Sequence, residues 1–143
     1  MGLDVGDKRI GLALSDAMGI LASPLTIIDR GDEQQALEEI VAIIDQHQVG
    51  QIIVGLPLST DGGIGQQAAK VKTFVEILSR RVDVPIEFRD ETLTTVEARR
   101  IMLTSRSKKN RQKSRDDDVA AAVLLQGYLE EKANRQQISY PDI

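Results

Sequence analysis

The 143-residue sequence contains no cysteine and no tryptophan, and it has one histidine, two tyrosines and two phenylalanines. The missing cysteines exclude disulfide bonds, cysteine-ligated zinc and thiol catalysis. No apolar run approaches the roughly 20 residues of a transmembrane helix, and the first residues lack the layout of a signal peptide. The length corresponds to one domain with its own hydrophobic core. We therefore expect a single soluble domain, residues 1–143, in the cytoplasm and away from membranes.

Positive charge is scarce in most of the chain and concentrated in one segment. The formal net charge is −4, yet residues 104–115, TSRSKKNRQKSR, contain no acidic residue. The cations of this segment are Arg106, Lys108, Lys109, Arg111, Lys113 and Arg115. We predict a flexible loop that binds phosphate groups, and the alternative is a soluble connector. Because aromatic residues are few, we expect contacts with structured or duplex backbone rather than stacking on single-stranded bases.

Hydrophobic periodicity predicts an α/β protein with a mixed sheet. The chain starts with an antiparallel meander of three strands, in MGLDVG (1–6), RIGLALSD (9–16) and PLTIID (24–29). Two helix–strand units follow, with helices in 32–48 and about 66–81 and strands in 51–57 and 85–91. Two helices close the chain, about 94–103 and 116–131, and a loose tail is expected over about 133–143.

Acidic side chains occur at three places that this sheet could bring together. Asp4 lies in the first strand, Glu91 follows the fifth strand, and three aspartates, residues 116–118, open the last helix. Clustered carboxylates repel one another, so such a cluster indicates a bound cation, and hard oxygen ligands favour Mg²⁺ or Mn²⁺. Each acid also has a simpler interpretation: Asp4 could shape the turn before Gly6, Glu91 could be solvated, and the aspartates could cap the helix.

Four motifs in the same order resemble one protein family over nearly the whole chain. They are LDVGDKRIGLALSD, IIVGLP, DETLTT followed by VEARR, and an aspartate, Asp117, that two intervening residues separate from AAAVLLQGYL. Together they resemble the pre-16S rRNA nucleases, also called Holliday-junction-resolvase-like proteins, a branch of the ribonuclease H-like superfamily. The resemblance implies a five-stranded mixed sheet of order 3-2-1-4-5, with the second strand antiparallel, flanked by helices.

The resemblance also implies catalytic and metal-binding roles for Asp4, Glu91 and Asp117. Asp4 would bridge two ions, and the other two carboxylates would each hold one of them. Metal-activated water would then replace a histidine base, which suits the composition because His47 is the only histidine. His47 itself is expected to be an exposed residue at the end of the first helix.

Three features depart from the family pattern. Only Met1 precedes Gly2, so the first strand is either short or begins upstream of this sequence. Thr92 stands where the family has a cation that could help to hold a phosphate, which puts full activity in doubt. The family's Lys-x-Asp before the last helix is Arg115-Asp116-Asp117 here, so the positive charge remains and an extra acid adjoins it.

Two further segments could bind the substrate, and each also has a simpler structural interpretation. Lys8 and Arg9, in the first turn, could flank a nucleic-acid substrate or could be solvated hairpin charges. The glycine-rich segment STDGGIG (59–65) could present backbone amides to a phosphate. Because it lacks the Lys-Ser/Thr ending of a P-loop, an ordinary strand-to-helix turn is the preferred interpretation.

These observations predict a metal-dependent nuclease that acts on structured nucleic acid, with the precursor of 16S ribosomal RNA as the substrate that the resemblance implies. Cleavage of branched DNA at Holliday junctions is the nearest alternative, and Thr92 suggests a catalytically weak binding module as another. GLDVGDKRIG also resembles the first phosphate-binding hairpin of actin-like phosphotransferases, but 143 residues supply barely one of their two lobes. Association with the ribosome or its precursor would follow from an RNA substrate, for a monomer or a homodimer.

Overall fold

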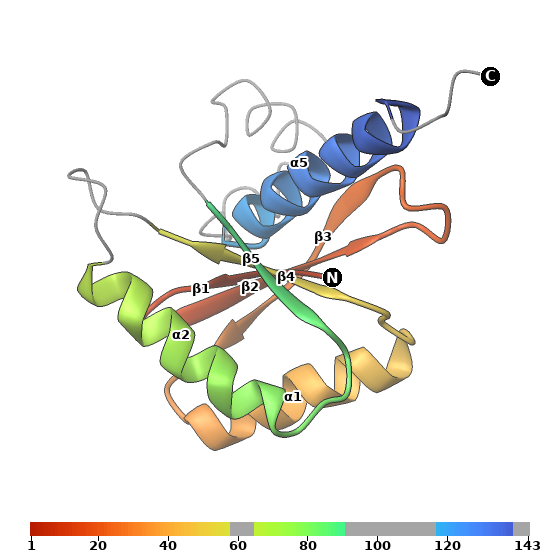
Figure 1. Cartoon of the computed structure of the whole chain (residues 1–143). Helices are drawn as coiled ribbons and strands as arrows, with labels where there is room; N and C mark the ends of the chain where they lie inside the picture. The colour runs from red at the N-terminus through yellow and green to blue at the C-terminus, as the bar shows by residue number, and fades with distance from the viewer. Residues whose placement is uncertain (58–64, 91–116, 139–143) are drawn as a thin grey trace, which may run out of the picture.

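A computed structural model of the chain describes residues 1–57, 65–90 and 117–138. These residues contain a five-stranded sheet of order β3-β2-β1-β4-β5 (Figure 1). The strands are β1 (Gly2–Val5), β2 (Arg9–Ser15), β3 (Ala22–Asp29), β4 (Ile52–Leu56) and β5 (Ile86–Asp90). β2 is antiparallel to both of its neighbours, whereas β1, β4 and β5 are parallel. The strand order and directions predicted from the sequence are confirmed.

Helices cover both faces of this sheet. α1 (Glu33–Gln46) and α2 (Gln66–Ser79) lie on one face, and α5 (Asp117–Ile138) lies on the other (Figure 1). Asp32 caps α1 by accepting a hydrogen bond from the backbone N–H of Gln35 at 3.2 Å. His47 ends the same helix and is exposed, as expected. No helix in the described part of the chain is long and apolar enough to cross a membrane.

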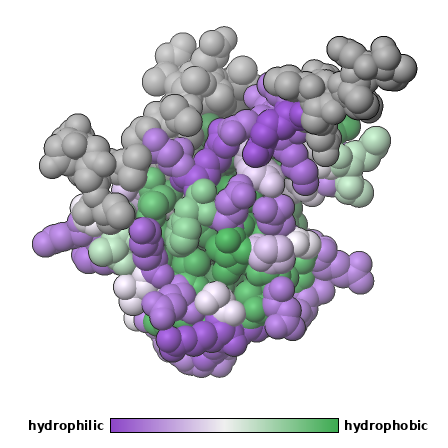
Figure 2. Space-filling model, viewed as in Figure 1, coloured by the Kyte–Doolittle hydropathy of each residue, from purple (hydrophilic) through white to green (hydrophobic). Residues whose placement is uncertain are grey.

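The two faces of the sheet are packed with side chains of different size. The face under α1 and α2 holds large apolar residues with almost no exposed surface, among them Leu3, Ile10, Leu12, Val54 and Phe74. The layer between the sheet and α5 combines large side chains such as Ile53, Leu124 and Tyr128 with small residues. The small residues are Ala13, Ala22, Ala121 and Ala122. Apolar surface is also visible over the edge strand β5 and α2 (Figure 2), where Phe88 is 38% exposed.

Helix α5 is longer than the sequence pattern predicts. We predicted a helix over 116–131 and a loose tail from about 133, but the helix continues to Ile138, so the prediction of the tail is wrong for 133–138. The extra residues contain neither glycine nor proline, and Lys132, Ala133, Arg135 and the glutamines favour helix. Arg135 in the last turn also suits the negative end of the helix. The predicted helix at 94–103 and the basic segment 104–115 lie outside the described residues.

Glycines in β1 and β2 let the backbone of α5 lie directly on the sheet. A Cβ atom on Gly2 would come within 2.7 Å of the carbonyl oxygen of Ala121. A Cβ atom on Gly11 would overlap the backbone carbonyl of Asp117, the first residue of the helix. Only glycine fits at such a close approach of two backbones. The start of α5 is therefore positioned by Gly11.

We expect Gly11→Ala to destabilise the protein by about 3 kcal/mol, because the new methyl group forces the start of α5 away from β2. This corresponds to a fall of roughly 6–12 °C in the melting temperature. Alanine is the better strand residue, so a loss of stability reports the clash and not strand propensity. Urea unfolding monitored by circular dichroism gives the measurement.

Gly50→Ala is the matched control, because nothing lies within 4 Å of a Cβ atom at Gly50. We expect its free energy of unfolding to stay within about 0.5 kcal/mol of the wild type. Equal stabilities of Gly11→Ala and the wild type would contradict the close packing of α5 on β2.

Candidate active site

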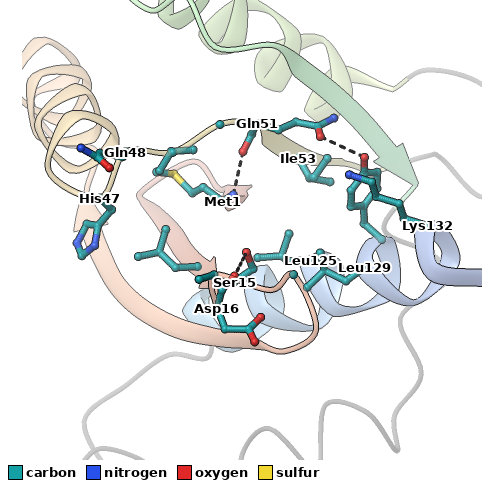
Figure 3. Close-up of a pocket in the computed structure, with 16 residues that line it drawn as sticks. Met1, Ser15, Asp16, His47, Gln48, Gln51, Ile53, Leu125, Leu129 and Lys132 are labelled. Atoms are coloured by element: carbon teal, nitrogen blue, oxygen red, sulfur yellow. Dashed lines mark hydrogen bonds between the residues drawn. The ribbon is translucent and has the colours of Figure 1, made fainter. Parts of the chain in front are cut away.

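A cavity lies at the edge of the sheet where β1 and β4 begin (Figure 3). It measures about 590 Å³ and lies between the β2–β3 hairpin, the end of α1 and the middle of α5. Backbone amides of Leu21 and Ile20 lower the pKa of Asp16 beside it, and burial lowers the pKa of the Met1 ammonium to about 6. Neither Asp4 nor Asp117, the two predicted catalytic acids that the structure describes, lines this cavity, so it is not the candidate active site.

Asp4 lies near the carboxyl end of β1, on the face of the sheet that α5 covers. It pairs directly with Gly11 of β2, and directly opposed residues of antiparallel strands project to the same face. Gly2, two residues earlier, projects to this face as well, because a Cβ atom there would meet α5. The Asp4 side chain is partly buried. Asp4 is therefore a strand residue beside the start of α5.

Asp117 reaches the same place from the other end of the chain. Its backbone carbonyl rests on Gly11, the cross-strand partner of Asp4. Its carboxylate Oδ2 accepts a hydrogen bond from Nε of Arg9 at 3.1 Å, so the two side chains form an ion pair. The exposed fractions of these side chains are 32% for Arg9 and 25% for Asp117. Asp4, Arg9 and Asp117 thus gather around Gly11, although 108 residues separate the members of the ion pair.

Asp118 is the most buried charged residue of the described chain, with 9% of its surface exposed. Its Oδ1 accepts a hydrogen bond from the backbone N–H of Val119 at 2.9 Å, which suits an acid in the first turn of a helix. The sequence pattern favours Asp117 only modestly over Asp118 as the inward-pointing acid, because apolar residues follow both on every side of the helix. Burial distinguishes the two, and only the tertiary structure reveals it.

The third predicted carboxylate, Glu91, lies outside the described residues. The same is true of Asp116, which precedes Asp117 in the sequence. Asp90, the last residue of β5, is partly buried. Within the described ranges, no group of three or more histidine, aspartate or glutamate side chains is placed to hold a metal ion. The metal-binding roles of Asp4, Glu91 and Asp117 therefore stay predictions.

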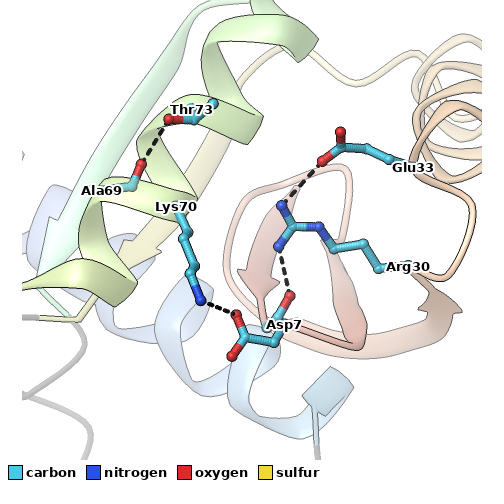
Figure 4. Close-up of polar contacts among 7 residues, drawn as sticks. Asp7, Arg30, Glu33, Ala69, Lys70 and Thr73 are labelled. Atoms are coloured by element: carbon cyan, nitrogen blue, oxygen red, sulfur yellow. Dashed lines mark hydrogen bonds and ion pairs between the residues drawn. The ribbon is translucent and has the colours of Figure 1, made fainter.

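The turn between β1 and β2 is tied to two other elements by residues that the sequence analysis did not single out (Figure 4). Arg30, after β3, donates a hydrogen bond to the carbonyl of Gly6 at 2.8 Å, and its guanidinium lies 4.8 Å from the centre of the Phe74 ring. Lys70 of α2 forms an ion pair with Asp7 at 3.6 Å. These contacts hold the turn and the strand residue that follows it, Arg9, in place.

Lys8 and Arg9, the two cations of this turn, have different surroundings in the structure. Lys8 is exposed, as expected of a hairpin charge, whereas Arg9 is engaged with Asp117. A second hollow of about 440 Å³ opens beside both of them, and Arg30 and two acids also line it. The carboxyl edge of β1 therefore carries a concave surface where basic side chains lie among two acids, Asp7 and Asp29. Neither Asp4 nor Asp117 lines this hollow. Lys108, Lys109, Arg111, Lys113 and Arg115 lie outside the described residues.

Comparisons with known proteins show the family of this chain. A family model described as "RuvX: Holliday junction resolvase" matches residues 1–131. A protein of Roseiflexus sp. (strain RS-1), named "Putative pre-16S rRNA nuclease", is 47% identical over 130 residues, which cover 91% of this chain and 92% of that protein. A protein of the same name from Dehalococcoides mccartyi is 50% identical over 127 residues, with 89% and 94% covered.

Solved structures show the same fold at low sequence identity. The structure described as "T. thermophilus RuvC in complex with Holliday junction substrate" superposes with a TM-score of 0.62 at 13% identity, over 92% of this chain and 93% of that one. The fowlpox virus resolvase bound to Holliday junction DNA superposes with a TM-score of 0.57 at 11% identity, over 92% and 96%. The expected ribonuclease H-like fold and the family resemblance are both confirmed. With the family model matching residues 1–131 and the close relatives covering about nine-tenths of its length, the chain belongs to the RuvX family.

Proposed function

We propose that this protein is a divalent-metal-dependent nuclease that cuts phosphodiester bonds in structured nucleic acid, and that the precursor of 16S ribosomal RNA is its substrate. The observation that carries the proposal is the meeting of Asp4 and Asp117 around Gly11, from opposite ends of the chain. Relatives of 41–50% identity carry the name of a pre-16S rRNA nuclease, which supports the substrate.

The side chains at this place suit Mg²⁺ or Mn²⁺. Carboxylate oxygens are the ligands that these ions prefer. The guanidinium of Arg9 forms an ion pair with Asp117, which shows that this carboxylate can bind a positive charge. We propose that Asp4, Glu91 and Asp117 together hold two ions. When bound, the ions supply activation of water and stabilisation of the leaving oxygen.

The remaining side chains would bind and orient the substrate. Lys8 and Arg9 line the hollow at the carboxyl edge of β1, where they could bind a phosphate group of the substrate. We propose that the basic residues of segment 104–115 add contacts to the nucleic-acid backbone. His47, the single histidine, is not needed as a base. It lines the cavity of about 590 Å³ at the edge of the sheet where β1 and β4 begin.

Cleavage of Holliday junctions is the second candidate, because the matching family model is described by that activity. A cytoplasmic location and association with the ribosome or its precursor follow from an RNA substrate and are part of the proposal. Whether the chain acts as a monomer or a homodimer is left to the measurement of its mass in solution.

Cleavage assays on precursor 16S rRNA fragments, linear duplex DNA and four-way DNA junctions test the proposed function. We expect cleavage of the RNA with Mg²⁺ or Mn²⁺, complete loss of cleavage with a chelator, and recovery when the ion is returned. Preferential cutting of the four-way junction would assign the second candidate function. Cleavage that persists in the chelator would contradict the metal-dependent mechanism.

We expect Asp4→Asn to lower the cleavage rate by at least about a hundredfold, because the substitution removes an anionic ligand. Stability should not fall, since asparagine has the same shape and the change removes one negative charge from clustered carboxylates. Single-turnover cleavage and thermal unfolding measure the two effects. The control is Asp45→Asn, an exposed residue of α1, which should leave both unchanged. An active Asp4→Asn protein would rule out the mechanism, and a simultaneous loss of stability would identify Asp4 as a structural residue.

The basic segment makes a separate prediction about binding. If its cations contact phosphates, the logarithm of affinity for a duplex falls with the logarithm of salt by nearly one unit per contact. Replacement of Lys108, Lys109 and Arg111 by alanine should flatten that slope by up to about three units. Binding is measured on an Asp4→Asn background to prevent cleavage. Identical slopes would identify the segment as a connector that does not contact the substrate.

A further inference from the structure

Arg9 is engaged with the same carboxylate that the proposed function assigns to a metal ion. Its Nε donates to Oδ2 of Asp117 at 3.1 Å, across the junction of β2 and α5. A divalent ion that binds Asp117 must therefore share this carboxylate with the guanidinium or displace it. The ion pair and the ion site cannot be independent of each other.

The pair is placed so that it can open. About a third of the Arg9 side chain and a quarter of the Asp117 side chain are exposed to water, and partly exposed ion pairs contribute little net stability. A divalent ion brings twice the charge of the guanidinium, so it can replace Arg9 as the partner of Asp117. Exchange of one cation for the other keeps the carboxylate neutralised throughout.

The backbone around Arg9 restricts any movement to the side chain. The turn before it is closed by a hydrogen bond from the N–H of Gly6 to the Arg9 carbonyl at 2.8 Å, and Arg30 donates to the carbonyl of Gly6. Arg9 is also paired with Asp29 in the β2–β3 ladder. A guanidinium released from Asp117 would thus remain at the hollow that Arg9 lines. There it could bind a phosphate oxygen, for which its planar set of donors is suited.

We propose that Arg9 takes the place of a divalent ion at Asp117 in the metal-free protein and turns to the substrate phosphate when the ion binds. This inference rests on the proposed metal site at Asp4 and Asp117. It adds that Arg9 lowers the affinity for metal and raises the rate of cleavage, two effects of opposite sign. A purely structural ion pair would have neither effect.

Calorimetric titration of the nucleic-acid-free protein with Mn²⁺ tests the first effect. We expect Arg9→Gln to bind Mn²⁺ roughly three to ten times more tightly than the wild type, because a competing cation is gone. Arg80→Gln is the matched control: it removes the same charge from an ion pair of similar length, 3.0 Å, on the exposed surface of α2. Its Mn²⁺ affinity should stay within about twofold of the wild type.

Cleavage at saturating Mn²⁺ tests the second effect. Arg9→Gln should cut roughly tenfold more slowly in a single turnover although it holds the ion more tightly, because a phosphate contact is lost. Arg9→Lys keeps the charge and should bind Mn²⁺ nearly as the wild type does. Tighter metal binding together with slower cleavage is the signature of the proposed exchange.

The wild-type protein provides a readout that needs no variant at Arg9. The Nε–H proton of Arg9, observed by NMR, should be protected from solvent exchange without metal and should lose protection as Mg²⁺ is added. Unchanged protection, or equal Mn²⁺ affinities of Arg9→Gln and the wild type, would overturn this inference and leave the proposed function intact. Wild-type Mn²⁺ binding that Asp117→Asn does not weaken would instead overturn the metal site and this inference with it.

Discussion

The direct contact between the backbone of α5 and the strand residue Gly11 is the constraint on which the candidate site depends. It places Asp117 over the neighbour of Asp4, so residues from the two ends of the chain share one location. Any side chain at position 11 would push the helix outward and separate the two carboxylates. The packing of one glycine therefore has a consequence for chemistry as well as for stability.

The two faces of the sheet divide the tasks of folding and function. Large side chains between the sheet and helices α1 and α2 bury most of the apolar surface, which is the main source of stability. The opposite face also contains alanines and glycines among its larger side chains, and these small residues allow a close approach of helix and sheet. Carboxylates repel one another, and Arg9 offsets that repulsion at Asp117. A side chain thus supplies positive charge next to Asp117.

Much of the fold was predictable because local patterns agreed with each other and with a family resemblance. Alternating and continuous apolar runs located β1, β2, β4 and β5 to within a few residues, and the resemblance supplied their order. The predicted end of α5 was wrong because the charged and amide residues after Lys132 resemble a disordered tail in composition, although they are good helix formers. Two of the three proposed metal ligands can be located in the structure, and Glu91 cannot, since it lies outside the described residues.

By itself, the sequence determined which residue types could serve the chemistry: carboxylates but no cysteine, a single histidine, and a concentrated basic segment. It also predicted most of the described helices and strands, because these follow from periodicities of a few residues, but it did not predict where α5 ends. Only the tertiary structure decided that Arg9 pairs with Asp117, that Arg30 and Lys70 hold the first turn, and that Asp118 is the buried acid. These facts depend on contacts between residues far apart in the chain, and no local pattern records where a helix comes to rest on a sheet.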